Sequence, residues 1–172
     1  MTFDKLKQLF PDATAETWHQ HSNGNGWVKN SAHVEPTVFI GVDCIVFGAA
    51  RVFGAARVFG DARVFGDAQV FGAAQVSGAA QVFGDAWVSG DAWVFTPLQI
   101  AGTKHFVTVS AYGMLNIGCE KHPIAWWQEH YKAIGRRERY SKSQIAEYQN
   151  YIELARVWMK IHKVDGTPEA TS

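Results

Sequence analysis

The sequence predicts a mainly β protein, a parallel β-helix of about four triangular coils with a short N-terminal helical lid and a C-terminal β-hairpin plus two helices. Three observations lead to this fold class. An aliphatic residue recurs every six positions from Val28 to Ile100, a small residue stands two positions before it, and glycine stands two positions after it from Gly48 to Gly90. The chain accordingly divides into four predicted segments: an N-terminal helical cap (1–25), the repeat array (26–102), a C-terminal hairpin with helices (103–163) and a disordered tail (164–172).

The period of six is the strongest of the three observations. It does not fit a helical face of 3.6 residues per turn, but it is a multiple of the strand period of two. Alanine fills the small position in nine of the thirteen hexads. In each Ala-x-Val triplet we therefore expect Ala and Val to face inward and the middle residue to face outward. The predicted inward series is Val28, Val34, Ile40, Val46, Val52, Val58, Val64, Val70, Val76, Val82, Val88, Val94 and Ile100.

The glycines suit the corners between strands, because glycine adopts backbone angles that other residues avoid. Each hexad is thus predicted to be a short strand followed by a turn. One hexad cannot bury its valine alone, so successive coils must stack and share one core. Three hexads form a triangular coil of about 18 residues, and the array forms about four coils.

The Val-x-Gly-x-Ala-x array resembles the left-handed β-helix of hexapeptide-repeat proteins, which include acyltransferases and gamma-class carbonic anhydrases. The left-handed sense is implied by this resemblance alone. The segments Gly26–Val28 and Ser31–Val34 are similar to the first coil of such proteins. Together with the array and the terminal helices, the segment Ile117-Gly118-Cys119-Glu120-Lys121-His122 resembles uncharacterised members from phages and prophages. This likeness implies no particular activity.

The N-terminal segment predicts a short helix. Phe3, Leu6, Leu9 and Phe10 recur at helical spacing, and Pro11 ends the pattern. A β-helix has open ends whose backbone groups invite aggregation, so we expect this segment to serve as a lid.

After Ile100 the period of six stops and the pattern changes to a hairpin and helices. Lys104–Ser110 and Met114–Ile117 read as two strands joined by a turn. Pro123 is well placed to begin a helix of about ten residues that ends at Gly135. Ser141 is a candidate N-cap for a longer helix. The apolar stripe of that helix is predicted to contain Ile145, Tyr148, Ile152, Ala155 and Met159.

Composition excludes several classes of function. Sixteen basic and sixteen acidic residues cancel, so no net field draws the chain to nucleic acid or to an anionic membrane. The N-terminus lacks the continuous apolar stretch of a signal peptide or membrane span. Cys44 and Cys119 are too few for a disulfide framework, so a reducing cytoplasm is the expected compartment.

Cys119 and His122 form the one pair with familiar site spacing. A Cys-x-x-His pair can ligate zinc or form a thiolate–imidazole couple. A zinc site needs three or four ligands, and His105 is the only obvious third. We favour the simpler interpretation, a semi-buried thiol with a capping imidazole, and expect no metal and no cofactor.

The resemblance to enzymes of this architecture implies specific residues that the array lacks. Acyltransferases of the class use a histidine between subunits and a loop excursion from the coils, and gamma carbonic anhydrases hold zinc with three histidines. Residues 27–102 contain one histidine, His33, and no inserted loop. No catalytic residue is therefore predicted. We favour a non-enzymatic binding or structural protein, and an acyl-CoA-dependent acyltransferase is the alternative.

The outward phenylalanines predict self-association. Sorting by 18 residues gives three columns: Phe47, Phe65 and Phe83; Phe53 and Phe71; Phe59 and Phe95 on either side of Ser77. Three aromatic residues in file form an apolar strip, and such strips mark interfaces. We expect a homotrimer with Phe47, Phe65 and Phe83 nearest the three-fold axis, or else terminal helices that cover a column within one subunit.

The middle residues of the strands are the candidate binding positions for a ligand or partner: Arg51, Arg57, Arg63, Trp87 and Trp93. The simplest interpretation of the arginines is a solvated face. A belt for an anionic small ligand is the alternative, but the three arginines occupy different faces of one prism and converge only where subunits meet. A counter-defence protein of phage type that binds a host protein or a small nucleotide fits this class.

Overall fold

A computed structural model describes residues 1–90, 92–93 and 96–164. The chain separates into two compact units, Met1–Pro97 and Leu98–Ser172, which we call the N-terminal and C-terminal units. The predicted array extended to Gly102, so the N-terminal unit ends slightly earlier than the periodicity suggested.

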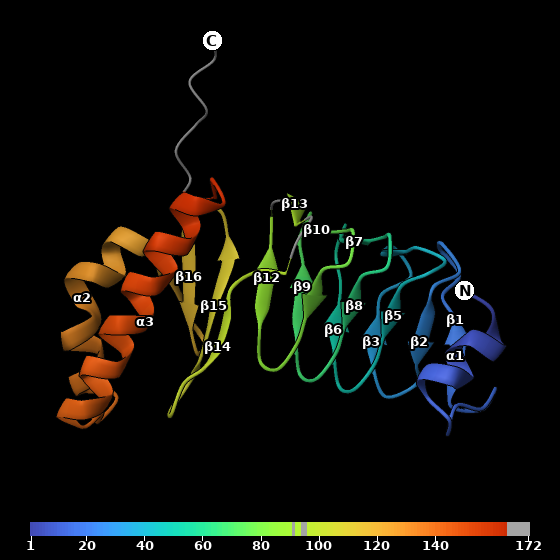
Figure 1. Cartoon of the computed structure of the whole chain (residues 1–172), viewed down its shortest axis with the longest axis horizontal. Coiled ribbons are helices and arrows are strands. Elements are labelled where there is room, and N and C mark those ends of the chain that lie inside the picture. Colours follow the sequence, from blue (N-terminus) through green and yellow to red (C-terminus); the bar gives the residue numbers. More distant parts are fainter. Residues whose placement is uncertain (91, 94–95, 165–172) are drawn as a thin grey trace, which may run out of the picture. The chain divides into compact units, whose positions relative to one another are not determined.

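The N-terminal unit is a β-solenoid of about four coils. In the described part of the chain, its strands form three parallel stacks of four, which we call faces A, B and C. Face A contains β2 (Trp27–Lys29), β5 (Ile45–Val46), β8 (Arg63–Val64) and β11 (Gln81–Val82). Face B contains β3 (His33–Val34), β6 (Arg51–Val52), β9 (Gln69–Phe71) and β12 (Trp87–Ser89). Face C contains β4 (Phe39–Ile40), β7 (Arg57–Val58), β10 (Gln75–Val76) and β13 (Ala92–Trp93). In Figure 1 the strands of face B stand side by side from β3 to β12.

Valine and alanine fill the solenoid core. On face A, Val46, Val64 and Val82 lie in register from coil to coil, and each is 0% exposed. The inward register is confirmed from Val28 to Val88, although Val34 in the first coil is only half-buried. The same strand period that predicted the inward positions therefore explains the core.

The corner glycines are required for two reasons, which Gly48 illustrates. Its φ of +75° is a conformation that residues with a Cβ rarely adopt. A Cβ added there would also lie 2.8 Å from the amide nitrogen of Gly66 in the next coil. The corners can stack at strand spacing because neither residue carries a side chain.

The register changes in the last coil. β13 pairs with β10 so that Trp93, and not Val94, lies opposite Val76. Trp93 therefore takes the inward position and is 0% exposed, which corrects the prediction that it faces outward. The physical reason is that the last layer has no further coil to cover it, and an indole covers more apolar surface than a valine does. Phe95 and Asp91 also lie outside the described residues.

The N-terminal segment covers the first coils from the side and along their edge. Helix α1 (Phe3–Leu9) ends before Pro11, as predicted. Its Leu6 packs with Trp27 and Ile45, which are outward positions of face A. Strand β1 (Trp18–Gln20) pairs antiparallel with β2, so the edge of face A is not left bare.

The C-terminal unit contains a four-stranded antiparallel sheet. Its strands are β14 (Gln99–Ala101), β15 (Phe106–Ala111), β16 (Met114–Ile117) and β17 (Glu120–Pro123). β15 and β16 form the predicted hairpin, but the two outer strands were not predicted. Ile100 was expected to face the solenoid core, and instead it lies opposite Val107 in this sheet. Pro97 explains the change, because a proline has no N–H with which to continue the parallel ladder.

Helices α2 (Ile124–Arg137) and α3 (Lys142–Ile161) pack on the sheet and on each other. The prediction that α2 ends at Gly135 was wrong, because Gly135 is buried inside the helix. A Cβ there would lie 2.9 Å from the Cγ1 of Ile145, so the glycine allows α2 and α3 to approach closely. Ser141 caps α3 through a capping box with Gln144, as predicted.

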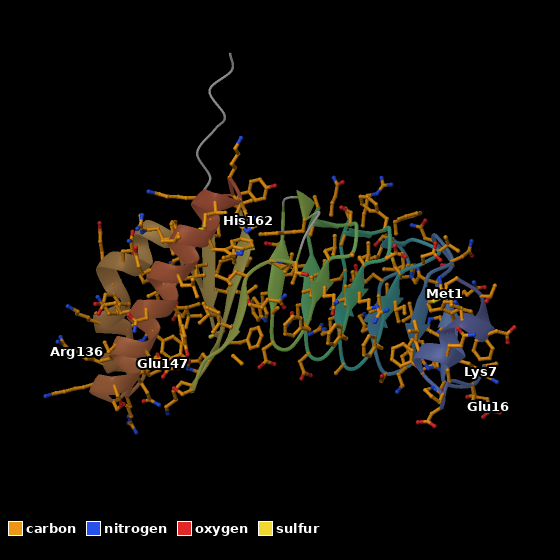
Figure 2. The ribbon with its side chains drawn as sticks, viewed as in Figure 1. Met1, Lys7, Glu16, Arg136, Glu147 and His162 are labelled. Carbon is orange, nitrogen blue, oxygen red and sulfur yellow. The ribbon has the colours of Figure 1, made fainter. Side chains whose placement is uncertain are left out.

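The predicted apolar stripe of α3 faces its own unit. Tyr148, Ile152, Ala155 and Met159 are buried, and Ile145 is half-buried. The Tyr148 hydroxyl donates a hydrogen bond to the carbonyl of His105 at 2.8 Å. Glu147, labelled in Figure 2, accepts a hydrogen bond from the amide nitrogen of Thr103 at 2.9 Å. The loop between β14 and β15 is thus held by α3.

The predicted disordered tail begins one residue too early. Val164 is buried, and its carbonyl accepts a hydrogen bond from the amide nitrogen of Gly113 at 2.7 Å. Residues 165–172 lie outside the described part of the chain.

Candidate functional site

Face B brings together two of the predicted binding residues. Its outward ladder runs from His33 to Arg51, Gln69 and Trp87, each opposite the next in the adjacent strand. Strands are spaced about 4.8 Å apart, so Arg51 and Trp87 stand about 10 Å from each other on one surface. Both alternate with inward valines, which fixes their outward direction.

Aromatic side chains connect the two ends of this ladder. The rings of Phe53 and Phe71 stack at 5.3 Å, and Trp87 meets Phe71 edge to face at 6.3 Å. The Arg51 guanidinium lies 5.8 Å from the Phe53 ring centroid, within the range of a cation–π interaction. We call Arg51, Phe53, Phe71 and Trp87 the arginine–aromatic face. Arg51 is exposed and the three rings are half-buried, so the surface is accessible from one side.

The other predicted binding residues lie elsewhere. Arg57 belongs to face C, where its guanidinium lies 5.2 Å from the Phe39 ring centroid. Arg63 belongs to face A, between Ile45 and Gln81. Within one chain the three arginines do not converge, and Trp93 is buried in the core. The sequence analysis did not predict a shared site for Arg51 and Trp87, although the two residues lie two coils apart in the same 18-residue column.

The predicted interface column exists, and one end of it is covered. The Phe65 ring stacks on Phe47 at 4.9 Å and on Phe83 at 5.5 Å. Phe47 also meets Phe10 at 5.0 Å and Trp18 at 6.4 Å between ring centroids. The N-terminal segment therefore covers Phe47, the first residue of the column. The C-terminal helices had been the expected cover if a column was buried within one subunit.

The candidate zinc residues do not form a metal site. Cys119 lies in the tight turn between β16 and β17, where it is exposed and not semi-buried as predicted, and with His105 it lines a cavity of about 90 Å³. His122 stacks instead on Trp126 at 3.7 Å, and its Nε2 lies 3.1 Å from a Glu120 oxygen. In the described part of the chain, no group of three or more His, Cys, Asp or Glu side chains could hold a metal ion.

The electrostatics around Cys119 also differ from those of a catalytic couple. No hydrogen bond joins Cys119 to either histidine among the described residues. Hydrogen bonds from His122 and then from Arg137 lower the pKa of Glu120, so this carboxylate is ionised and already engaged. Burial raises the pKa of Tyr140, which lines the same cavity, so its phenol stays neutral.

Cys44 is a structural thiol. Its side chain is 0% exposed, and its Sγ donates a hydrogen bond to the carbonyl of Gly60 at 3.3 Å. Burial raises the pKa of this thiol to about 11. A nucleophilic cysteine requires a lowered pKa, so Cys44 belongs to the core and not to a site.

A search for membrane spans and three comparisons with known proteins complete the description of the site. No helix in the described residues is long and apolar enough to cross a membrane. Residues 56–72 match a family model described as the YdcK beta solenoid repeat. This match covers β7, β8 and β9, and it supports the repeat assignment without naming a ligand. No curated protein and no solved structure matches the chain.

Proposed function

We propose that the chain is a non-enzymatic binding protein that presents the arginine–aromatic face to a partner protein. One observation carries the proposal: Arg51, Phe53, Phe71 and Trp87 form a contiguous surface on a single face of the solenoid. Tryptophan and arginine are the residues most enriched among those that dominate binding energy at protein interfaces. The surface therefore has the composition of an interface centre.

The backbone beneath this face supports the proposal. β6, β9 and β12 are paired strands whose neighbouring residues are buried valines. The backbone of such a scaffold loses little conformational freedom on binding, and a preorganised surface binds more tightly than a mobile one.

A protein partner suits this face better than a small anion does. Arg51 is the one arginine of the three that lies on face B, and it already contacts Phe53. The chain as a whole carries no net charge that would attract an anionic ligand. Apolar rings with a single cation match a partner surface that offers an apolar patch beside one carboxylate.

As the finer class we propose a counter-defence protein of phage or prophage type that captures a host protein through this face. A small nucleotide is the second candidate ligand, and it would use the Trp87 ring for stacking and Arg51 for one phosphate. This ligand requires a cation–aromatic pair on one face, which Arg51 and Trp87 provide.

The test uses substitutions on two faces of the same solenoid. A protein captured from a host lysate by the full chain is purified, and its affinity is measured for Arg51→Ala, Trp87→Ala and the control Arg57→Ala. Arg57 is matched because it is exposed and contacts a phenylalanine, but on face C. Loss of an interface hot spot costs about 2 kcal/mol or more, so Arg51→Ala and Trp87→Ala should weaken binding by at least about thirtyfold. Equal weakening by Arg57→Ala, or no weakening by either face B variant, contradicts the proposal.

The acyltransferase alternative has a separate test. A ligand present at about 100 times its dissociation constant stabilises a folded protein by about 2.7 kcal/mol. Under the binding-protein proposal, acetyl-CoA leaves the melting temperature unchanged. A clear rise in melting temperature favours the transferase instead.

The proposal includes assembly as a homotrimer. The Phe65 and Phe83 rings are half-buried and stack in file, whereas Phe47 is additionally covered by Phe10 and Trp18. The contact between copies would then centre on Phe65 and Phe83, away from the N-terminal segment.

A further inference from the structure

The C-terminal unit contains a pocket that the proposed function does not use. It has a volume of about 270 Å³ and lies between α2 and α3. The lining residues are Gln128 and Tyr131 from α2, and Gln149, Asn150, Ile152 and Glu153 from α3. This volume is close to the lower end of the range for small-molecule sites.

Three side-chain carboxamides give the pocket its chemistry. Gln128, Gln149 and Asn150 are exposed, and none of their side chains hydrogen-bonds to another of the residues that the structure describes. Each carboxamide carries two N–H donors and one acceptor oxygen. The wall therefore offers donors and acceptors together, a combination that suits a ligand with groups of both kinds.

The charges at the pocket cancel. Glu153 accepts a hydrogen bond from the Nε of Arg156 at 2.9 Å and a second one from its Nη2. These hydrogen bonds lower the pKa of Glu153, so it remains ionised while Arg156 neutralises it. None of the six lining residues is a cation, and of the two cations beside them Arg156 is paired with Glu153 and Lys132 lies at the Tyr131 ring, so the wall itself offers a phosphate or carboxylate no direct counter-charge. The remaining lone pairs of Glu153 can still accept hydrogen bonds from hydroxyl groups.

Two of the lining residues supply apolar surface. Ile152 is 2% exposed, and Tyr131 is half-buried. The Lys132 ammonium lies 5.6 Å from the centroid of the Tyr131 ring. An aromatic ring next to amides can contact the C–H groups of a ligand while the amides hold its polar edge.

From this combination we infer that the α2–α3 pocket binds a neutral saccharide. Saccharide hydroxyls both donate and accept, which matches the carboxamides and the Glu153 oxygens. The C–H face of a pyranose ring matches Tyr131 and Ile152. The pocket lies in the C-terminal unit and the arginine–aromatic face in the N-terminal unit, so either proposal can fail without the other.

The experiment is saturation-transfer NMR on the full chain with D-glucose, D-galactose and N-acetylglucosamine as probes. At least one probe should receive saturation from the unsubstituted protein. Removing one hydrogen-bonding group costs about 1.4 kcal/mol, so Gln128→Leu should weaken binding by about tenfold, and Tyr131→Ala should weaken it at least as much. Gln75→Leu, which changes an exposed amide of face C, should leave binding unchanged.

Three results overturn the inference. The first is no saturation transfer to any of the three probes. The second is equal transfer in Gln128→Leu and in the unsubstituted protein, and Gln128 is exposed enough that this variant retains its fold. The third is binding of adenosine in place of the saccharides, because a nucleobase would then be the ligand class.

Discussion

The position of a residue within the hexad determines whether its side chain is buried, because successive side chains of a strand point to opposite faces. Val64 is fully buried in register with Val46 and Val82, whereas Gln75, two strands later, is exposed. The two positions lie in equivalent short strands, so the direction of the side chain is the main difference between them. A carboxylate introduced at the first position would have neither water nor a cation beside it.

Substituting Val64 by Asp should therefore abolish folding. An unpaired buried carboxylate costs several kcal/mol, a large part of the stability of a domain of this size. Gln75→Asp should change the free energy of unfolding by less than about 0.5 kcal/mol. Circular dichroism in buffer shows whether Val64→Asp folds, and urea unfolding followed by circular dichroism measures the change for Gln75→Asp. Equal tolerance of the two substitutions would mean that inside and outside have been exchanged.

The two cysteines should differ in reactivity. The raised pKa of Cys44, about 11, means that about one thiol in a thousand is ionised near pH 8, and its side chain is also buried. Cys119 is exposed in a turn. A thiol reagent near pH 8 should thus label Cys119 alone in the native protein, and both cysteines in denaturant. Because the thiolate is the reactive form, labelling of Cys44 should increase as the pH rises toward 11, and rapid native labelling near pH 8 would contradict its burial.

At the scale of elements, the period of six predicted the strands of the solenoid but not every pairing between strands. The Ala-x-Val triplets specify which residues face inward, because alternation is a local property of a strand. Ala92-Trp93-Val94 fits two registers equally well, and the one with Trp93 inward depends on what closes the last layer. β14 and β17 pair with the predicted strands β15 and β16, but no local pattern identified β14 and β17 themselves, so Ile100 could not be assigned to its sheet.

The candidate site could also be predicted only in part, because some of its features are local in the sequence and others depend on tertiary packing. The 18-residue column that contains Arg51 and Trp87 can be derived from the sequence. The contacts through Phe53 and Phe71 depend on side-chain rotamers at the corner, which no repeat pattern specifies. The α2–α3 pocket depends on how two helices pack, and the exposed polar residues that line it carry no periodic signal.

Close packing of α2 against α3 requires the absence of a side chain at Gly135. Gly135→Val should destabilise the protein by about 1–3 kcal/mol, because the new carbons would overlap Ile145. The control Ala133→Val places the same side chain at an exposed position of the same helix, so it should cost less than about 1 kcal/mol of helix propensity. Chemical denaturation of both variants supplies the comparison. If the two costs are equal, helix propensity and not packing explains the glycine.

At the scale of the whole molecule, residues of the N-terminal unit itself pair with the first strand of face A and fill the last layer of the core. β1 pairs with β2, and Trp93 fills the inward position of the fourth coil on face C. The pairing of β1 with β2 opposes edge-to-edge growth at that end of face A, and Trp93 keeps the last core layer filled. Association through the sides of the solenoid is then the route to assembly that its surface favours, and the Phe column is the largest regular apolar feature on those sides that the sequence predicted.

The last prediction concerns this assembly. Burial of apolar surface contributes about 25 cal/mol per Å², so a strip of about 300 Å² per subunit offers several kcal/mol, against an association cost of about 4–15 kcal/mol. The column alone is therefore marginal, and one charge within it should suffice to dissociate the trimer. Size-exclusion chromatography with light scattering should give three times 19.1 kDa for the unsubstituted chain, and the monomer mass for Phe65→Glu with an unchanged circular dichroism spectrum. The matched control, Phe53→Glu, alters the second column and should remain trimeric. A monomeric unsubstituted chain contradicts the trimer, and dissociation by Phe53→Glu in place of Phe65→Glu would move the interface to face B.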